Sequence, residues 1–220
     1  MKSFDDIWET IHATEEWGKY PSEPVIRFVA RNYYNKDRGC IKMLDFGCGG
    51  GGANTWYLTR EGFDVYAFDG SKSAIHKVEE RLKKENLCVN LRICDALETN
   101  YEDNFFDCII DNVSICANRK SAIIAMYEEI YRMLKAGGRI FTTVFSQNTT
   151  GFGLGIEIEK NTFNHIEQGN LAGRGIIHFY DQKEITEMLS DVGFHSINVD
   201  FLNYTDRGNI VEQFLIQAEK

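Results

Sequence analysis

Four consecutive glycines, Gly49–Gly52, follow an apolar run in the stretch MLDFGCGGGGAN, from Met43 to Asn54. Between a strand and a helix, a glycine-rich turn lets the backbone approach a ligand closely and presents free amide groups at the helix N-terminus. Counted from Gly47, the run fits both the GxGxG and the GxGxxG pattern, so it does not identify the ligand by itself. It does favour a fold in which a strand is followed at once by a tight turn and a helix.

Strand-like and helix-like patterns alternate along the next hundred residues, which predicts a doubly wound α/β fold with a parallel sheet covered on both faces. Apolar runs predict five parallel strands, at residues 41–46, 65–68, 89–93, 106–110 and 139–145. One helix carries Ile75, Val78 and Leu82 on a single stripe at spacings of three and four. A second helical pattern over Ala122–Leu134 is ended by the pair Gly137-Gly138.

The C-terminal part departs from this alternation. Asp181 with Glu184 three residues later predicts a helix cap, and the helix ends at Gly193. Two strand-like runs, 195–202 and 210–218, are separated by the turn-rich NYTDRGN and predict a hairpin.

The length of 220 residues, of which 43% are hydrophobic, is enough for one full core, so we expect a single domain over 1–220. Within it we expect a helical lid segment (1–34), a ligand-binding core (41–145), a glycine-rich insertion on the substrate side (146–180) and a C-terminal helix and hairpin (181–220). Ligands of open parallel sheets lie beyond the carboxyl ends of the strands, so the first and third of these segments are natural covers. The insertion has an alternative interpretation as a surface loop without a binding role.

Composition narrows the function classes. The net charge of −9 disfavours nucleic acid and anionic membrane surfaces as partners. The N-terminal stretch has no uninterrupted apolar core, so we expect neither a secretory signal nor a membrane span. We therefore expect a cytoplasmic protein. The six cysteines form no CxxC pair and are interpreted as free thiols, and we expect no metal site.

Acidic residues at the strand ends carry more information about the ligand than the glycines do. Asp45 would face a cationic ligand group and repel a dinucleotide pyrophosphate, although a carboxylate that only braces the loop is the alternative. Asp69 suits ribose hydroxyls in either kind of site. Asp95 and Ala96, after the third strand, could read the edge of an adenine through a side-chain acceptor and a backbone amide.

The chain resembles class I S-adenosylmethionine-dependent methyltransferases in five motifs. These are LDFGCGGG at 44–51, VYAFDGS at 65–71, ICDA at 93–96, FFDCIIDN at 105–112 and LKAGGRIF at 134–141. The resemblance covers about 41–145 and implies a Rossmann-like, mostly parallel, seven-stranded sheet with an antiparallel C-terminal strand. It also implies S-adenosylmethionine as cofactor and S-adenosylhomocysteine as product. The stretch Gly49–Ile75 is locally similar to the tellurite-resistance and thiol methyltransferase branch.

The resemblance also implies roles for individual residues. Asp45, Gly47 and Gly49 would hold the methionine end, Asp69 the ribose, and Asp95 with Ala96 the adenine. The remaining cofactor-binding residues implied in this way are Cys48, Asn54, Gly70, Ser71, Asp111, Asn112 and Val113.

The lead segment EEWGKYPSEPVIRF is similar to small-molecule methyltransferases in which an N-terminal helix carries aromatic side chains over the cofactor. By that likeness Trp17 and Tyr20 would cover the cofactor and favour its sulfonium through their ring faces. Packing of these two rings in a core is the alternative.

Methyl transfer from a sulfonium is an in-line displacement, so the protein mainly aligns acceptor and methyl group. If a base is used, His178 is the candidate, with His12 and His165 behind it, and an ordinary core or surface histidine is the alternative for each. No NPPY-like tetrad follows the fourth strand, which disfavours a nucleic-acid amino-methyltransferase. The double-glutamate hairpin of arginine methyltransferases is not evident, and no histidine and carboxylate cluster suggests the divalent metal of catechol-type enzymes. By elimination we expect a small-molecule acceptor with an oxygen, nitrogen or sulfur nucleophile.

Two other functions stay open. A protein of this fold could bind S-adenosylmethionine or S-adenosylhomocysteine without catalysis, in which case a second pocket beside the sulfonium would be open or filled. A nicotinamide-dependent oxidoreductase is disfavoured by Asp45, by ICDA and by the terminal hairpin. We expect a monomer or a homodimer.

Overall fold

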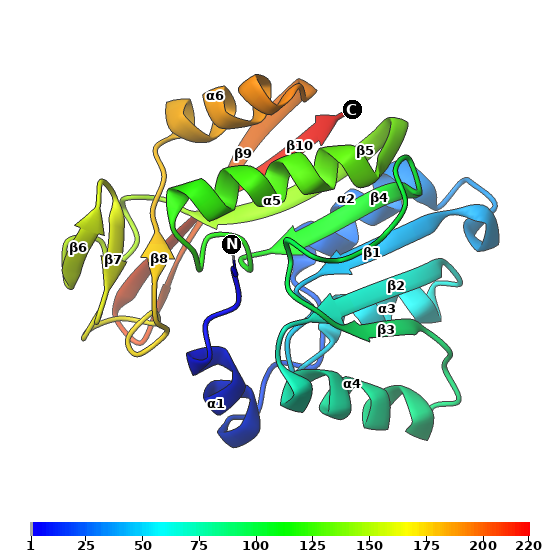
Figure 1. Ribbon diagram of the computed structural model, residues 1–220, viewed down its shortest axis with the longest axis horizontal. Helices are drawn as coiled ribbons and strands as arrows, with labels where there is room; N and C mark the ends of the chain where they lie inside the picture. The colour runs from blue at the N-terminus through cyan, green and yellow to red at the C-terminus, as the bar shows by residue number, and fades with distance from the viewer. Residues whose placement is uncertain (1) are drawn as a thin grey trace.

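The computed structural model describes residues 2–220, and Figure 1 shows the arrangement of its helices and strands. In chain order they are α1 (Ile7–Thr14), α2 (Glu23–Tyr33), a 3₁₀ turn (Arg38–Cys40), β1 (Lys42–Phe46), α3 (Ala53–Arg60), β2 (Asp64–Asp69), α4 (Lys72–Lys84), β3 (Asn90–Ile93), β4 (Phe106–Asn112), α5 (Lys120–Met133), β5 (Leu134–Phe145), β6 (Ile156–Glu159), β7 (Thr162–Asn164), β8 (Ile177–His178), α6 (Gln182–Val192), β9 (His195–Asp206) and β10 (Asn209–Glu219).

The main sheet has seven strands in the order β3-β2-β1-β4-β5-β10-β9. Strands β1 to β5 are mutually parallel, whereas β10 is antiparallel to both of its neighbours, β5 and β9. The predicted α/β fold with a mostly parallel, seven-stranded sheet and an antiparallel C-terminal strand is confirmed. Strand order reverses between β1 and β4, and ligands of such sheets bind beyond the carboxyl ends of the strands at this switch point.

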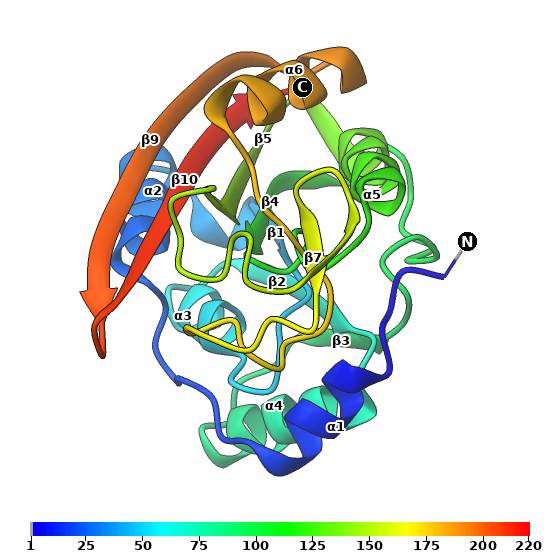
Figure 2. The same cartoon turned by 90° about the vertical axis from the view of Figure 1, so that its left-hand side faces the viewer.

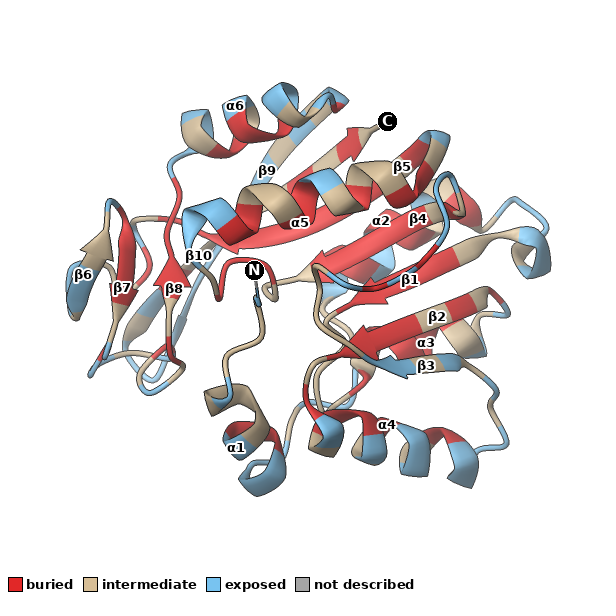
Figure 3. Cartoon of the chain, viewed as in Figure 1, coloured by how far each residue is buried: buried red, intermediate tan, exposed pale blue. Residues whose placement is uncertain are grey.

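Successive residues of the central strands enter two different cores, because side chains of a strand alternate between the faces of a sheet. Met43 of β1 packs with α2 and α3, and its neighbour Leu44 packs with α5 and α6. Ile110 and Ile109 of β4 divide in the same way. This explains why these strands read as continuous apolar runs, and Figure 3 shows the buried central strands beside the exposed edge strand β3.

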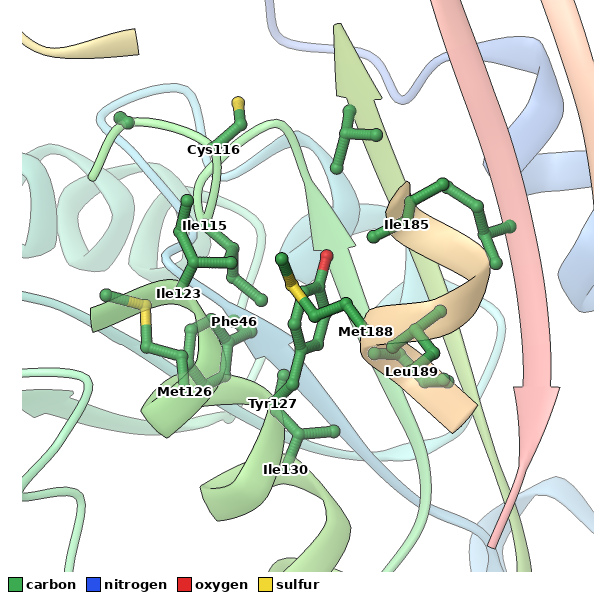
Figure 4. Packing of buried hydrophobic residues seen from close by; sticks show 14 of the residues in the cluster. Phe46, Ile115, Cys116, Ile123, Met126, Tyr127, Ile130, Ile185, Met188 and Leu189 are labelled. Atoms are coloured by element: carbon green, nitrogen blue, oxygen red, sulfur yellow. The ribbon is translucent and has the colours of Figure 1, made fainter. Parts of the chain in front are cut away.

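Helices α5 and α6 pack on each other on one side of the sheet. Figure 4 shows Tyr127 of α5, which is fully buried, in the same cluster as Met188 and Leu189 of α6. The predicted cap of α6 is present, since the Asp181 carboxylate accepts from the Glu184 amide at 2.8 Å. Helix α6 ends at Gly193, whose φ of 116° is left-handed.

The pair Gly137-Gly138 lies within a strand, contrary to the predicted helix end. Helix α5 stops at Met133, and β5 starts at Leu134 with a break in its register against β4 before Arg139. Gly137 has a φ of 73°, and its amide donates to the carbonyl of Lys220. The glycines therefore form the bulge at which β5 meets the end of β10.

The predicted insertion after β5 contains a second, three-stranded antiparallel sheet of β6, β7 and β8. Figure 2 shows this segment and the β9–β10 hairpin on the side of the molecule to which the carboxyl ends of the parallel strands point. Between residues 2 and 220 we find no helix long and apolar enough to cross a membrane.

Candidate active site

A cavity of about 560 Å³ lies beyond the carboxyl ends of the parallel strands. Eleven of the residues predicted to bind the cofactor line it: Trp17, Tyr20, Gly47, Cys48, Gly49, Asn54, Asp69, Gly70, Ala96, Asn112 and Val113. Five predicted site residues do not line it, namely Asp45, Ser71, Asp95, Asp111 and His178.

The glycine turn between β1 and α3 is packed too closely for side chains. Gly47 has a left-handed φ of 69°, and a Cβ there would lie 2.0 Å from the Ser114 hydroxyl oxygen. A Cβ on Gly51 would lie 2.3 Å from the carbonyl oxygen of Gly18. The turn is thus clamped between the loop after β4 and the segment after α1, which leaves its inner surface as bare backbone facing the cavity.

Asp45 braces the start of α3. One carboxylate oxygen accepts from the Thr55 amide at 2.9 Å and from the Thr55 hydroxyl at 2.6 Å, and the other accepts from the Asn54 side-chain amide at 3.3 Å. Burial raises the pKa of Asp45 to about 6. These contacts match the interpretation of Asp45 as a carboxylate that braces the loop. Asn54, and not Asp45, lines the cavity wall at this point. Within residues 2–220 the buried Oδ1 of Asn54 has no hydrogen-bond partner.

Asp69 sits at the end of β2 with both oxygens facing the glycine turn and the loop to α4. Its carboxylate accepts from the Gly49 amide at 2.9 Å and from the Ser71 amide at 2.8 Å. Burial raises its pKa. The Ser71 hydroxyl caps α4 by accepting from the Ala74 amide and donates to Glu9 at 2.6 Å, which explains its absence from the cavity wall.

Asp95, at the end of β3, is engaged by the start of the chain. Its carboxylate accepts from the backbone amides of Ser3 and Phe4, from the Ser3 hydroxyl and from the Leu97 amide. Ser3 and Phe4 line the cavity at this end instead of Asp95.

Asp111 is fully buried and shapes the loop after β4. It accepts from the amides of Ser114 and Ile115 at 2.9 and 3.1 Å, and from the Thr142 hydroxyl at 2.5 Å. Burial raises its pKa to about 6. In the same loop Val113 adopts a left-handed φ of 59°, which is costly for a β-branched residue. Strain of this kind concentrates at functional sites, and Val113 lines the cavity.

His178 lies away from the cavity. It is fully buried, its Nδ1 is 2.7 Å from the Thr162 hydroxyl, and its Nε2 is 3.4 Å from Glu184. It therefore joins β8 to β7 and α6. His165 is exposed and does not line the cavity either, whereas His12 does, and its Nδ1 accepts from the Gly50 amide at 3.3 Å.

Helix α1 and the segment that follows it bring aromatic rings together beside the glycine turn. The ring of Trp17 is 5.3 Å from that of His12 and 6.2 Å from that of Trp8, between ring centroids. Tyr20 is 76% exposed at the cavity rim and meets Trp56 edge-on. The lid role of Trp17 and Tyr20 stays a prediction.

The insertion was predicted as a cover, but none of the residues with which it and the hairpin line the cavity was predicted from the sequence. Arg174 lies over the Trp17 ring at 5.3 Å and pairs with Glu15 at 2.7 Å, so the insertion touches the lid segment. Tyr204 and Gln213 line the cavity from β9 and β10. The arginine among the glycines of the insertion was the only local sequence feature that could have indicated a cavity-lining residue. No local feature distinguished the lining residues of the hairpin.

Comparisons with known proteins agree with this geometry. The family model described as a methyltransferase domain matches residues 43–138. Phosphoethanolamine N-methyltransferase 3 of Arabidopsis thaliana is 26% identical over 158 residues, which are 71% of this chain and 29% of that protein. The probable S-adenosyl-L-methionine-dependent methyltransferase TehB of Haemophilus influenzae is 29% identical over 97 residues, 44% of this chain and 33% of that protein. The chain thus spans about a third of the length of these curated relatives.

A solved structure described as a SAM-dependent methyltransferase from Methanosarcina mazei superimposes with a TM-score of 0.73 at 22% identity, over 90% of this chain and 98% of that one. The strand order, the bare glycine turn and the acids at the strand ends define a Rossmann-like methyltransferase fold. Together with the sequence matches, they make the chain similar to class I S-adenosylmethionine-dependent methyltransferases, with TehB among its relatives.

Proposed function

We propose that this chain binds S-adenosylmethionine at the glycine turn and transfers its methyl group to a small molecule held in the same cavity. The observation that carries the proposal is the continuity of the cavity. One cavity is lined by Gly49 and Asp69, by Val113, by Arg174 of the insertion and by Gln213 of the hairpin. A protein that only bound the cofactor would not need walls contributed by the insertion and the hairpin.

The chain offers groups that fit each part of the cofactor. Asn54 brings an unpartnered carbonyl oxygen, which suits the ammonium of the methionine end. Each oxygen of Asp69 accepts one backbone amide and retains a lone pair for a ribose hydroxyl. Cys94 and Ala96, at the end of β3, supply walls for the base.

The bound cofactor would supply the electrophilic methyl group, so the chain's own task is alignment and exclusion of water. Asp111 fixes the loop that presents Val113 and Ser114 to the cavity. The rings of Trp8 and Trp17 can favour a positive sulfonium beside them. We assign no base, because His178 lies outside the cavity and His12 is bonded to the glycine turn.

The acceptor side favours a small polar molecule. Most of its polar side chains are uncharged. The uncharged ones are Asn112, Ser114, Asn118, Asn170, Tyr204 and Gln213. Arg174 is the sole lysine or arginine among the residues lining the cavity. A cavity walled by Trp17, Arg174 and the hairpin suits a metabolite better than a polymer, in line with the name of the phosphoethanolamine N-methyltransferase relative.

Calorimetric titration with S-adenosylmethionine, S-adenosylhomocysteine and NAD in parallel tests the cofactor. We expect the first two to bind and NAD not to bind, and binding of NAD alone would refute the proposal. Asp69→Asn should weaken S-adenosylhomocysteine binding. The matched control is Asp64→Asn at the other end of β2, where the carboxylate pairs with Lys42 at 2.6 Å.

Acceptors are then screened with methyl-labelled cofactor against small thiols, phenols and amines. Transfer to any of them, lost in Asp69→Asn and retained in Asp64→Asn, supports an enzyme. Tight cofactor binding without transfer to any acceptor would favour the binding-only alternative.

A further inference from the structure

Residues 3 and 4 saturate the carboxylate of Asp95. Its Oδ2 accepts from the Ser3 and Phe4 amides, both at 2.8 Å, and its Oδ1 accepts from the Ser3 hydroxyl at 2.6 Å and from the Leu97 amide at 2.9 Å. A carboxylate has about four lone-pair sites. Asp95 therefore has none left for a ligand while residues 3 and 4 stay in place.

The ring of Phe4 lies directly on the backbone of Gly70. A Cβ on Gly70 would fall 2.1 Å from Cδ2 of this ring and 2.4 Å from its Cγ. Gly70 has no side chain to hold the ring away, so a flat aromatic group rests on the residue that follows Asp69. Phe4 and Gly70 both line the cavity.

This corner is where the base of a bound nucleoside would lie. The acid at the end of the second strand takes the ribose in sheets of this type, and here that acid is Asp69. Asp69 pairs with Ile93 of β3, and the Cys94 amide donates to the Asp69 carbonyl at 3.2 Å. The residues after β3, including Asp95, are thus the neighbours of the ribose site on the side away from the glycine turn.

We propose that residues 3 and 4 occupy the adenine subsite and compete with the cofactor for it. The Phe4 ring takes the place of the adenine ring on Gly70, and the Ser3 and Phe4 amides take the place of the exocyclic amine at Asp95. The inference rests on the proposed function, since it needs S-adenosylmethionine as the ligand.

The rest of the lid segment is held by other contacts, so these residues can leave alone. Glu9 of α1 accepts from the hydroxyls of Ser71 and Ser73, both at 2.6 Å, and His12 accepts from the Gly50 amide. Release of residues 3 and 4 breaks none of these bonds. The apparent Kd for the cofactor is then the intrinsic Kd divided by the fraction of molecules in which the adenine subsite is free.

The test compares S-adenosylhomocysteine binding to the unchanged protein and to Phe4→Ala by calorimetry. Removing the ring should tighten binding by about tenfold, since the competing ring contact is lost. Adenosine should gain by a similar factor and homocysteine, which lacks the base, should gain nothing. Phe201→Ala is the matched control, because Phe201 is 71% exposed on β9 and lies outside the cavity wall.

Amide hydrogen exchange gives a second readout, because displacement of residues 3 and 4 and closure of a lid change the exchange rate in opposite directions. Saturating S-adenosylhomocysteine should speed exchange of the Phe4 amide as the segment is displaced, whereas a lid that closes on the cofactor would slow it. Slower exchange, or unchanged or weaker binding in Phe4→Ala, refutes the competition while leaving the proposed cofactor intact. Failure of both proteins to bind S-adenosylhomocysteine would overturn the proposed function and this inference with it.

Discussion

The left-handed backbone at Val113 allows a substitution test in which the usual ranking of alanine and glycine is reversed. In ordinary backbone, glycine is less stable than alanine by about 0.5 to 1 kcal/mol. At a φ of 59° a side chain with a Cβ is strained by about 1 to 2 kcal/mol, and glycine is free of that strain. Val113→Gly should therefore be more stable than Val113→Ala by about 1 kcal/mol.

Urea unfolding followed by far-UV circular dichroism measures the difference, since both variants lose the same valine methyl groups and differ only in the Cβ. Ala125→Gly within α5 serves as the reference in ordinary helix and should lose about 1 kcal/mol. If Val113→Ala is the more stable of the pair, Val113 is not held in a strained conformation and its assignment to a functional loop loses its support. Both variants should also weaken cofactor binding, because Val113 forms part of the cavity wall.

Three further predictions concern buried and bridging groups. Burial raises the pKa of Asp111 to about 6, so between about pH 4 and 6 the native state holds a proton that the unfolded state has released. The contribution of Asp111 to wild-type stability should therefore fall by about 3 kcal/mol as the pH rises through this range. Asp111→Asn should lack this part of the fall, and parallel pH profiles of unfolding for the two proteins would contradict it. His178→Ala should lower stability by about 1 to 3 kcal/mol through the lost bond to Thr162 while cofactor affinity and turnover stay unchanged, and lost turnover at full stability would restore the base role. Arg174→Gln should raise the S-adenosylhomocysteine dissociation rate by up to about fivefold, because the insertion loses its contacts with Trp17 and Glu15. Stopped-flow fluorescence measures this rate, and an equal rate in both proteins would show that Arg174 does not help to hold the ligand in the cavity.

Features encoded over a few residues were predictable from the sequence. The glycine turn is read from backbone constraints within Gly47–Gly52, and the helix at Ile75, Val78 and Leu82 is read from a period of about 3.6 residues. The parallel sheet followed from the alternation of these patterns, and the resemblance supplied the antiparallel last strand.

Contacts between distant segments were not predictable in this way. Asp45 and Asp95 stand where the motifs place them, yet their oxygens are taken by Thr55 and by Ser3, and no local pattern indicates such partners. The same holds for Gln213, which reaches the cavity wall because β10 pairs with β5 across the sheet. Sequence periodicity tells which face of a strand a side chain occupies, but the partner on that face is set by packing of the whole chain.

The position of β10 has a consequence for biosynthesis. Strands β1 to β5 can pair as they leave the ribosome, but the outer edge of β5 finds its partner only when residues 209–219 have been made. Strand β9 cannot join the sheet earlier either, because β10 is its link to β5. For the time needed to synthesise the insertion, α6 and the hairpin, a nascent chain would carry an unpaired β5 edge. Such an edge is a target for chaperones and a starting point for aggregation.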